Sequence, residues 1–216
     1  MKKLVIFDMS GILFDTEKVL LDSNQQAFAQ ENIEFTYADY IKYAGTSQKQ
    51  NLNLTIEKVK DQNLGSKIYQ TAHEIRQDIY RDQGAPKMPG LDECLKELHA
   101  HSIDMLVASS NDLEVVELLL EKADISHYFN GIVAGDQLTQ AKPHPEIFLK
   151  SLVMGGVDKS EAVAIEDSIN GVEAGHQADL DVIMVPNLIQ PTEREKKNSL
   201  AVVDRVDLIL PYILEN

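Results

Sequence analysis

Residues 3–8 of this 216-residue chain are Lys3-Leu4-Val5-Ile6-Phe7-Asp8, a short apolar run that ends at a carboxylate. An uninterrupted apolar run of this length is typical of a strand that is buried on both faces of a parallel sheet. Ligands of such sheets bind beyond the carboxyl ends of the strands. The run therefore predicts a central strand and places Asp8 at the ligand-binding edge.

Four further apolar runs follow, at residues 104–108 (DMLVA), 131–134 (GIVA), 162–165 (AVAI) and 181–185 (DVIMV). Amphipathic helical patterns lie between them, at residues 90–100, 113–123, 145–153 and 169–178. Strands that alternate with helices of this length predict an α/β fold, a Rossmann-like parallel sheet with helices on both faces.

One segment breaks the alternation. Residues 16–83 contain no strand-like run, only helical patterns at residues 19–31, 37–43, 49–60 and 67–81. The Gly- and Pro-rich stretch 84–90 then marks the return to the alternating pattern. We therefore expect an α/β core domain of residues 1–15 and 86–216, with an all-helical domain of residues 16–85 inserted after the first strand.

The composition limits the possible partners. The formal net charge is −15, which disfavours binding to nucleic acid and to anionic membranes. Cys94 is the only cysteine, so an intrachain disulfide is excluded. The first apolar run is too short for a signal sequence, and no stretch is long enough to span a membrane. A cytoplasmic protein is expected; nothing fixes its oligomeric state, and a monomer is favoured.

Carboxylates follow two of the predicted strands. Asp8 follows the first, and Glu166 and Asp167 follow the strand at 162–165. Two carboxylates roughly 4 Å apart repel by about 4 kcal/mol at an effective dielectric constant of 20. Each acid alone could be a helix cap, since Asp is common there. Together at one edge they predict a divalent cation, and hard oxygen ligands favour Mg²⁺.

Other groups at this edge fit a phosphate. Ser109, Ser110 and Asn111 follow the strand at 104–108, where the start of the next helix would favour an anion. Lys142 supplies a positive charge, which a phosphate needs in so acidic a chain. With the charge of the phosphate neutralised, Asp8 becomes a candidate nucleophile that forms an aspartyl-phosphate.

Four stretches carry a resemblance to the haloacid dehalogenase superfamily of phosphohydrolases. Its four motifs resemble residues 7–17 (FDMSGILFDTE), 107–111 (VASSN), 141–148 (AKPHPEIF) and 165–175 (IEDSINGVEAG), in the same order and across nearly the whole chain. The helical insertion is similar to the cap of the subgroup that contains β-phosphoglucomutase and small sugar-phosphate phosphatases.

The resemblance implies a Mg²⁺-dependent phosphatase that acts on a small phosphorylated metabolite, with a sugar phosphate as the leading choice. It implies that Asp8 is the nucleophile and a metal ligand, and that Ser109 and Lys142 bind the phosphoryl group. It also implies that Asp167 and the backbone carbonyl of Ser10 ligate Mg²⁺, with Glu166 acting through water.

Ser10 departs from the family pattern, in which a second aspartate stands at this position and transfers protons to and from the substrate. A serine hydroxyl does not titrate near neutrality, and loss of a general acid–base typically costs about 10²- to 10⁴-fold in rate. Three interpretations stay open at this point: a slow or altered phosphatase, a metal- and phosphate-binding or regulatory homologue without catalysis, and an altered form of an enzyme that naturally carries the aspartate.

The cap motif also departs from the family pattern. In β-phosphoglucomutase a histidine corresponds to Leu20 and an arginine to Gln48. The absence of both side chains here weighs against a further interpretation, phosphotransfer of the mutase type, but leaves it open. Here the loop residue Gly45 and the nearby Lys49 are the candidates for substrate binding in the cap. A solvated lysine at the start of a helix is the alternative for Lys49.

Overall fold

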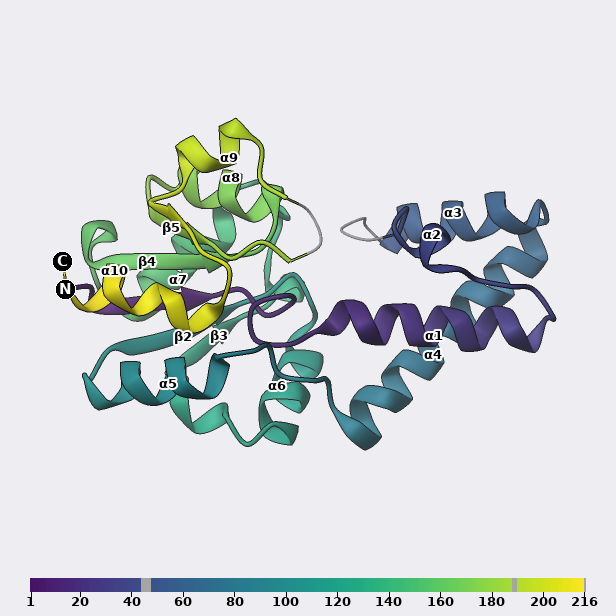
Figure 1. Ribbon diagram of the computed structural model, residues 1–216, viewed down its shortest axis with the longest axis horizontal. Helices are drawn as coiled ribbons and strands as arrows, with labels where there is room; N and C mark the ends of the chain where they lie inside the picture. Colours follow the sequence, from purple (N-terminus) through teal and green to yellow (C-terminus); the bar gives the residue numbers. More distant parts are fainter. Residues whose placement is uncertain (44–47, 188–189, 216) are drawn as a thin grey trace. The chain divides into compact units, whose positions relative to one another are not determined.

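Six parallel strands form the sheet in this computed structural model, which describes residues 1–43, 48–187 and 190–215. The strand order is β3-β2-β1-β4-β5-β6. The strands are β1 (Leu4–Phe7), β2 (Asp104–Ala108), β3 (Gly131–Val133), β4 (Ala162–Glu166), β5 (Asp181–Met184) and β6 (Ala201–Val202). The α/β fold and its parallel sheet are therefore confirmed, and all five predicted strands are present (Figure 1).

The first apolar run is the central strand. Leu4, Val5, Ile6 and Phe7 are fully buried, because β1 has a strand on either side and helices above and below. Phe7 is in register with Val107 of β2 and Ile165 of β4. Asp8, one residue further, thus emerges between the ends of these two strands.

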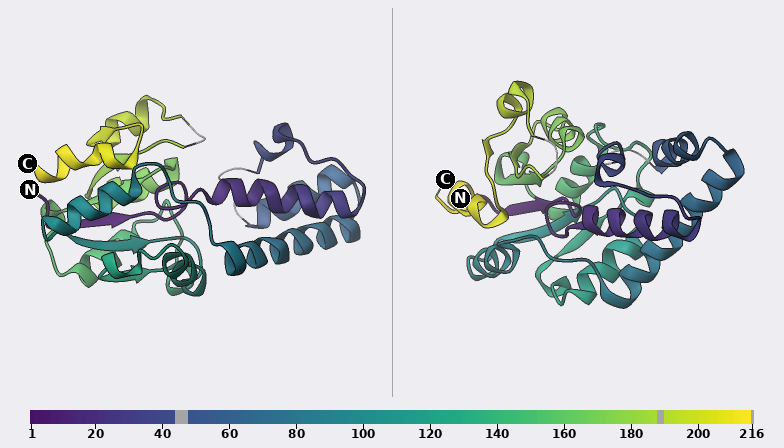
Figure 2. Two further views of the ribbon diagram at one scale, coloured as in Figure 1. Left: turned by 60° about the horizontal axis from the view of Figure 1, so that its bottom comes forward. Right: turned by 45° about the vertical axis from the view of Figure 1, so that its right-hand side comes forward.

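Helices cover both faces of the sheet (Figures 1 and 2). On one face, α7 (Glu146–Gly155) and α8 (Ile169–Gln177) bury a cluster that includes Leu4, Ile6 and Phe148. The other face carries α5 (Leu91–Ala100) and α6 (Leu113–Lys122). This division is expected of right-handed crossovers, because the chain winds outward from β1 in one direction and then returns to wind in the other.

The C-terminal region adds elements that the hydrophobic pattern did not predict. They are α9 (Glu193–Asn198), β6, the 3₁₀ helix η4 (Val206–Ile209) and α10 (Leu210–Leu214). Glu195 in α9 is buried and its carboxylate accepts hydrogen bonds from the backbone N and the hydroxyl of Thr192. This capping box makes the stretch 193–198 a helix, whereas the sequence analysis found no element there.

The helical unit has its own core. Its helices are α1 (Thr16–Gln30), α2 (Tyr37–Tyr40), α3 (Gln48–Val59) and α4 (Gln62–Gln83). Phe28 stacks on Phe35 at 4.8 Å between ring centroids, and Tyr40, Tyr43 and Ile68 are buried with them. Helix α4 begins five residues earlier than the apolar pattern predicts, because Asp61 caps its N-terminus by accepting a hydrogen bond from Leu64 N.

Backbone contacts divide the chain into two compact units. One consists of Met1–Asp15 and Pro86–Asn216, and the other of Thr16–Ala85. Within the described residues, no helix is both long and apolar enough to cross a membrane.

Candidate active site

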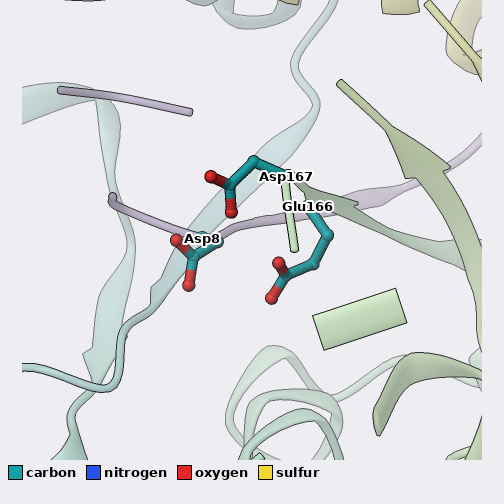
Figure 3. Close-up of side chains that lie close together, drawn as sticks. All are labelled: Asp8, Glu166 and Asp167. Carbon is teal, nitrogen blue, oxygen red and sulfur yellow. The ribbon is translucent and has the colours of Figure 1, made fainter. Parts of the chain in front are cut away.

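The carboxyl ends of β1 and β4 bring three carboxylates together. Asp8, Glu166 and Asp167 each offer an oxygen atom, and these atoms all lie within 4.8 Å of one another (Figure 3). Glu166 is fully buried and Asp8 nearly so. A set of hard, negatively charged oxygen donors this close together fits a divalent cation such as Mg²⁺.

Lys142 lies inside this acidic cluster. Its ammonium group donates to Asp8 Oδ1 at 2.6 Å, to Glu166 Oε1 at 2.5 Å and to the Ala108 carbonyl at 3.2 Å. A lysine has three N–H donors, so these acceptors use all of them. Burial opposes the charge on Lys142, but Asp8 and Glu166 together hold its pKa above the ordinary value.

Asp8 has a shifted pKa. Burial raises it most, the charge of Lys142 opposes that effect, and Glu166 adds to it, so that the pKa of Asp8 rises to about 7. Two buried carboxylates, Asp8 and Glu166, lie beside one ammonium group, that of Lys142. Without a divalent cation, one of the two negative charges has no compensating positive charge. The electrostatics therefore agree with the ligand chemistry in favouring a bound cation.

A neutral cluster at the same edge of the sheet is formed by Ser10, Ser109 and Asn111. Asn111 Nδ2 donates to Ser10 Oγ at 3.3 Å and to Ser109 Oγ at 3.2 Å, and Asn111 N donates to Ser109 Oγ at 3.1 Å. Ser109 is buried, whereas Ser110 is exposed. Helix α6 begins at Leu113, where the helical pattern predicted it, so Ser109, Ser110 and Asn111 lie in a loop before the helix and do not form its first turn.

Two glycines make room for the carboxylates, and the sequence analysis assigned them no role. Gly11 has a φ of +77°, and a Cβ atom there would lie 2.1 Å from Asp167 Oδ2. A Cβ atom at Gly171 would lie 1.9 Å from the carboxyl carbon of Glu166. Both glycines lie within the motif stretches 7–17 and 165–175. Their role could not be predicted from the sequence, because it depends on a carboxylate that occupies the space beside each glycine in the folded chain.

Eight of the ten predicted site residues belong to the α/β unit, at or after the ends of strands of one sheet: Asp8, Ser10, Ser109, Ser110, Asn111, Lys142, Glu166 and Asp167. Ser110 is the exposed member of this set. Gly45 lies outside the described residues. Lys49 lies in the first turn of α3 in the helical unit and is exposed. Leu20, the other cap position singled out, is partly buried against the core of that unit.

Comparisons with known proteins find relatives over most of the chain. The protein-family model described as haloacid dehalogenase-like hydrolase matches residues 5–185 of this chain. A phosphorylated carbohydrates phosphatase of Thermotoga maritima is 27% identical, covering 83% of this chain and 82% of its own length. The pyrophosphatase PpaX of Oceanobacillus iheyensis is 25% identical, covering 85% of this chain and 83% of its own length.

A solved structure extends the likeness to the fold. A Thermotoga maritima protein provisionally named as a β-phosphoglucomutase has a TM-score of 0.85 and 25% sequence identity. The match covers 99% of each chain, including the region of the helical insertion.

Proposed function

This chain belongs to the haloacid dehalogenase-like hydrolase family, and on that premise we propose that it is a Mg²⁺-dependent phosphatase that acts on a small phosphorylated metabolite through Asp8. The observation that carries the proposal is the placement of Asp8 at the end of β1, with Lys142 2.6 Å away and two further carboxylates beside it. Phosphatases among the relatives support the reaction class.

In the proposed reaction, Asp8 is the nucleophile. One of its oxygen atoms attacks phosphorus while the bond to the leaving oxygen breaks, which gives an aspartyl-phosphate; water then attacks phosphorus and releases Asp8. Lys142 lies close enough to reduce the repulsion between Asp8 and the incoming phosphate. To contact the phosphate directly, Lys142 must give up one of its three hydrogen bonds. The bond to the Ala108 carbonyl is the longest, at 3.2 Å, and we expect it to be the one replaced.

The residues that would hold Mg²⁺ are Asp8 and Asp167, with the backbone carbonyl of Ser10 and with Glu166 through water. A bound Mg²⁺ supplies positive charge that stabilises the oxygens of the transferring phosphoryl group. The carboxylate of Glu166 does not need Mg²⁺ to hold its position, because it accepts hydrogen bonds from Lys142 and, at 3.1 Å, from Ser168 Oγ. Ser109 and Asn111 supply hydrogen-bond partners for the phosphoryl oxygens.

We assign the helical unit, residues 16–85, to the role of a cap that excludes water while the phosphoryl group is transferred. Gly45 and Lys49 remain the proposed cap contacts to substrate. Their assignment rests on the sequence comparison made above.

A phosphate-release screen over small phosphorylated metabolites with Mg²⁺ tests the proposal. Phosphorylated carbohydrates enter it first, because one relative is named for them. Release that depends on Mg²⁺ and disappears in Asp8→Asn is expected. If no metabolite is hydrolysed above background, while Ser10→Asp restores hydrolysis, this chain is not an active phosphatase.

A second candidate is a protein that binds Mg²⁺ and phosphate without turnover, and Ser10 is the observation that favours it. Calorimetry with Mg²⁺ and inorganic phosphate would then show binding, while no substrate is consumed. Multiple turnovers at neutral pH would exclude this candidate, and interconversion of sugar phosphate isomers would favour mutase-type phosphotransfer instead.

A further inference from the structure

The neutral cluster of Ser10, Ser109 and Asn111 carries no proton that it can transfer. Ser10 lies two residues after Asp8, and its hydroxyl oxygen accepts a hydrogen bond from Asn111. The same amide reaches the hydroxyl of Ser109. Amides and aliphatic hydroxyls can hydrogen-bond to an oxygen atom, but they do not change protonation state near neutral pH.

Two ionisable groups at the site, Lys142 and Glu166, are engaged with other partners, and a third, Asp167, is a proposed ligand of Mg²⁺. The three N–H groups of Lys142 donate hydrogen bonds to Asp8, to Glu166 and to the backbone carbonyl of Ala108. Glu166 is fully buried, with one oxygen on Lys142 and the other on Ser168. In phosphoryl transfer the attacking and leaving oxygens lie roughly in line, on opposite sides of phosphorus. Lys142 is hydrogen-bonded to the attacking carboxylate of Asp8, and Glu166 is hydrogen-bonded to Lys142, so both lie on the attacking side of phosphorus. The leaving oxygen lies on the opposite side, where they cannot protonate it.

From this arrangement we infer that the chain prefers activated phosphates, namely acyl phosphates and phosphoanhydrides, over phosphate esters of alcohols. The inference rests on the proposed function and narrows its substrate class. Since none of these described groups is placed to protonate it, the leaving group departs as an anion. A carboxylate does so readily, because a carboxylic acid has a pKa of about 4. An alkoxide is a far stronger base and needs a proton as the bond breaks.

The bonds balance without an added reactant. An Asp8 oxygen forms the new bond to phosphorus, and the old bond gives both electrons to the leaving oxygen, which departs as a carboxylate or a phosphate. Water then forms a bond to phosphorus, and Asp8 regains the electron pair of the bond that breaks. The products are the leaving anion and inorganic phosphate, which retains the protons of the water molecule or passes one to the solvent.

The test compares substrates that share a phosphoryl group and differ in leaving group. The value of kcat/KM with saturating Mg²⁺ is measured for acetyl phosphate, for a series of aryl phosphates and for glycerol phosphate. The variants are the wild type, Ser10→Ala, which removes the hydroxyl without adding an acid, and Ser10→Asp, which adds one. Comparison between variants cancels the intrinsic reactivity of each substrate.

We expect a steep fall in kcat/KM with rising leaving-group pKa in the wild type and in Ser10→Ala. In Ser10→Asp the ratio of acetyl phosphate to glycerol phosphate should fall by about 10²- to 10⁴-fold, which is the usual contribution of a general acid. A wild-type ratio as small as that of Ser10→Asp would overturn the inference and leave the phosphatase proposal intact. No turnover of any substrate, even acetyl phosphate, would contradict the proposed function, and the inference with it.

Discussion

At the scale of single residues, Lys142 decides whether the acidic site is stable. Asp8 and Glu166 are both buried, and the ammonium group of Lys142 lies between them, 2.6 Å and 2.5 Å from their oxygens. Removing one partner from a buried ion pair leaves a charge without compensation, and this typically costs about 3–5 kcal/mol. We therefore expect the ammonium group of Lys142 to stabilise the fold as well as to take part in the proposed reaction.

We predict that Lys142→Met lowers the free energy of unfolding by about 3–5 kcal/mol in the presence of a chelator. Added Mg²⁺ should recover part of the loss. Denaturant unfolding measures both effects. The control is Lys159→Met, whose partner Asp179 is an exposed carboxylate, and no resolvable change in stability is expected there. Equal losses in the two variants would contradict this role for Lys142.

Gly11 offers a second test at this scale. Gly11→Ala places a methyl group 2.1 Å from Asp167 Oδ2, on a backbone with a φ of +77°. We predict weaker Mg²⁺ binding, by at least about tenfold, because Asp167 must move. Gly156→Ala is the matched control, since its φ is +63° and nothing lies within 4 Å of the new Cβ. Calorimetry should show unchanged Mg²⁺ affinity in the control, and equal affinity in both variants would argue against a positioning role for Gly11.

Single residues also mark a limit of the sequence analysis. The acids and Lys142 were predictable, because each follows an apolar run and strand ends share an edge. The hydrogen bonds of Asn111 to Ser10 and Ser109 were not, because they depend on how the loop after β2 folds back. Gly135 fixes that fold: a Cβ atom there would lie 2.2 Å from the Ser110 carbonyl oxygen.

At the scale of elements, short polar contacts set where helices begin. In α2, Asp39 accepts hydrogen bonds from the backbone N and the hydroxyl of Thr36, and Lys58 of α3 forms an ion pair with it at 2.9 Å. Burial alone would raise the pKa of Asp39, but the hydrogen bonds from Lys58 and Thr36 outweigh it and lower the pKa to about 2. The ionised carboxylate thus ties two helices together.

The sign of the resulting pH dependence follows from the depressed pKa. The contribution of Asp39 to stability is fully present above pH 3.8, the ordinary value, and is lost as the pH falls through about 2. We predict that Asp39→Asn lowers stability by about 1 kcal/mol at pH 7. The difference from the wild type should shrink between pH 4 and pH 2, as followed by thermal unfolding at each pH. A difference that stays constant across this range would contradict the assignment.

The elements also show what the hydrophobic pattern can and cannot predict. The strands β1 to β5 were predicted because each coincides with an apolar run in the sequence. The sixth strand, Ala201–Val202, was missed because two residues are too few to form a pattern. Helix α9 was missed because it is almost wholly polar, although Thr192 and Glu195 have the spacing of a capping box.

At the scale of the whole molecule, the net charge of −15 opposes an anionic substrate. Salt screens this repulsion, since the Debye length falls from about 30 Å at 0.01 M to about 8 Å at 0.15 M. We predict that kcat/KM rises about two- to tenfold over this range at constant free Mg²⁺. The rise should be larger for a substrate with two phosphates than for one with a single phosphate. A fall in kcat/KM with salt for both would mean that local positive charge governs the encounter.

The central claim concerns Asp8, and trapping its phosphorylated form tests it most directly. The chain is mixed with acetyl phosphate and Mg²⁺, quenched in acid within a turnover, digested and analysed by mass spectrometry. The account predicts a phosphoryl group on Asp8 in the peptide that contains β1, absent in Asp8→Asn and absent when Mg²⁺ is chelated. Turnover that continues in Asp8→Asn, or a phosphoryl group on another residue in the wild type, would contradict it.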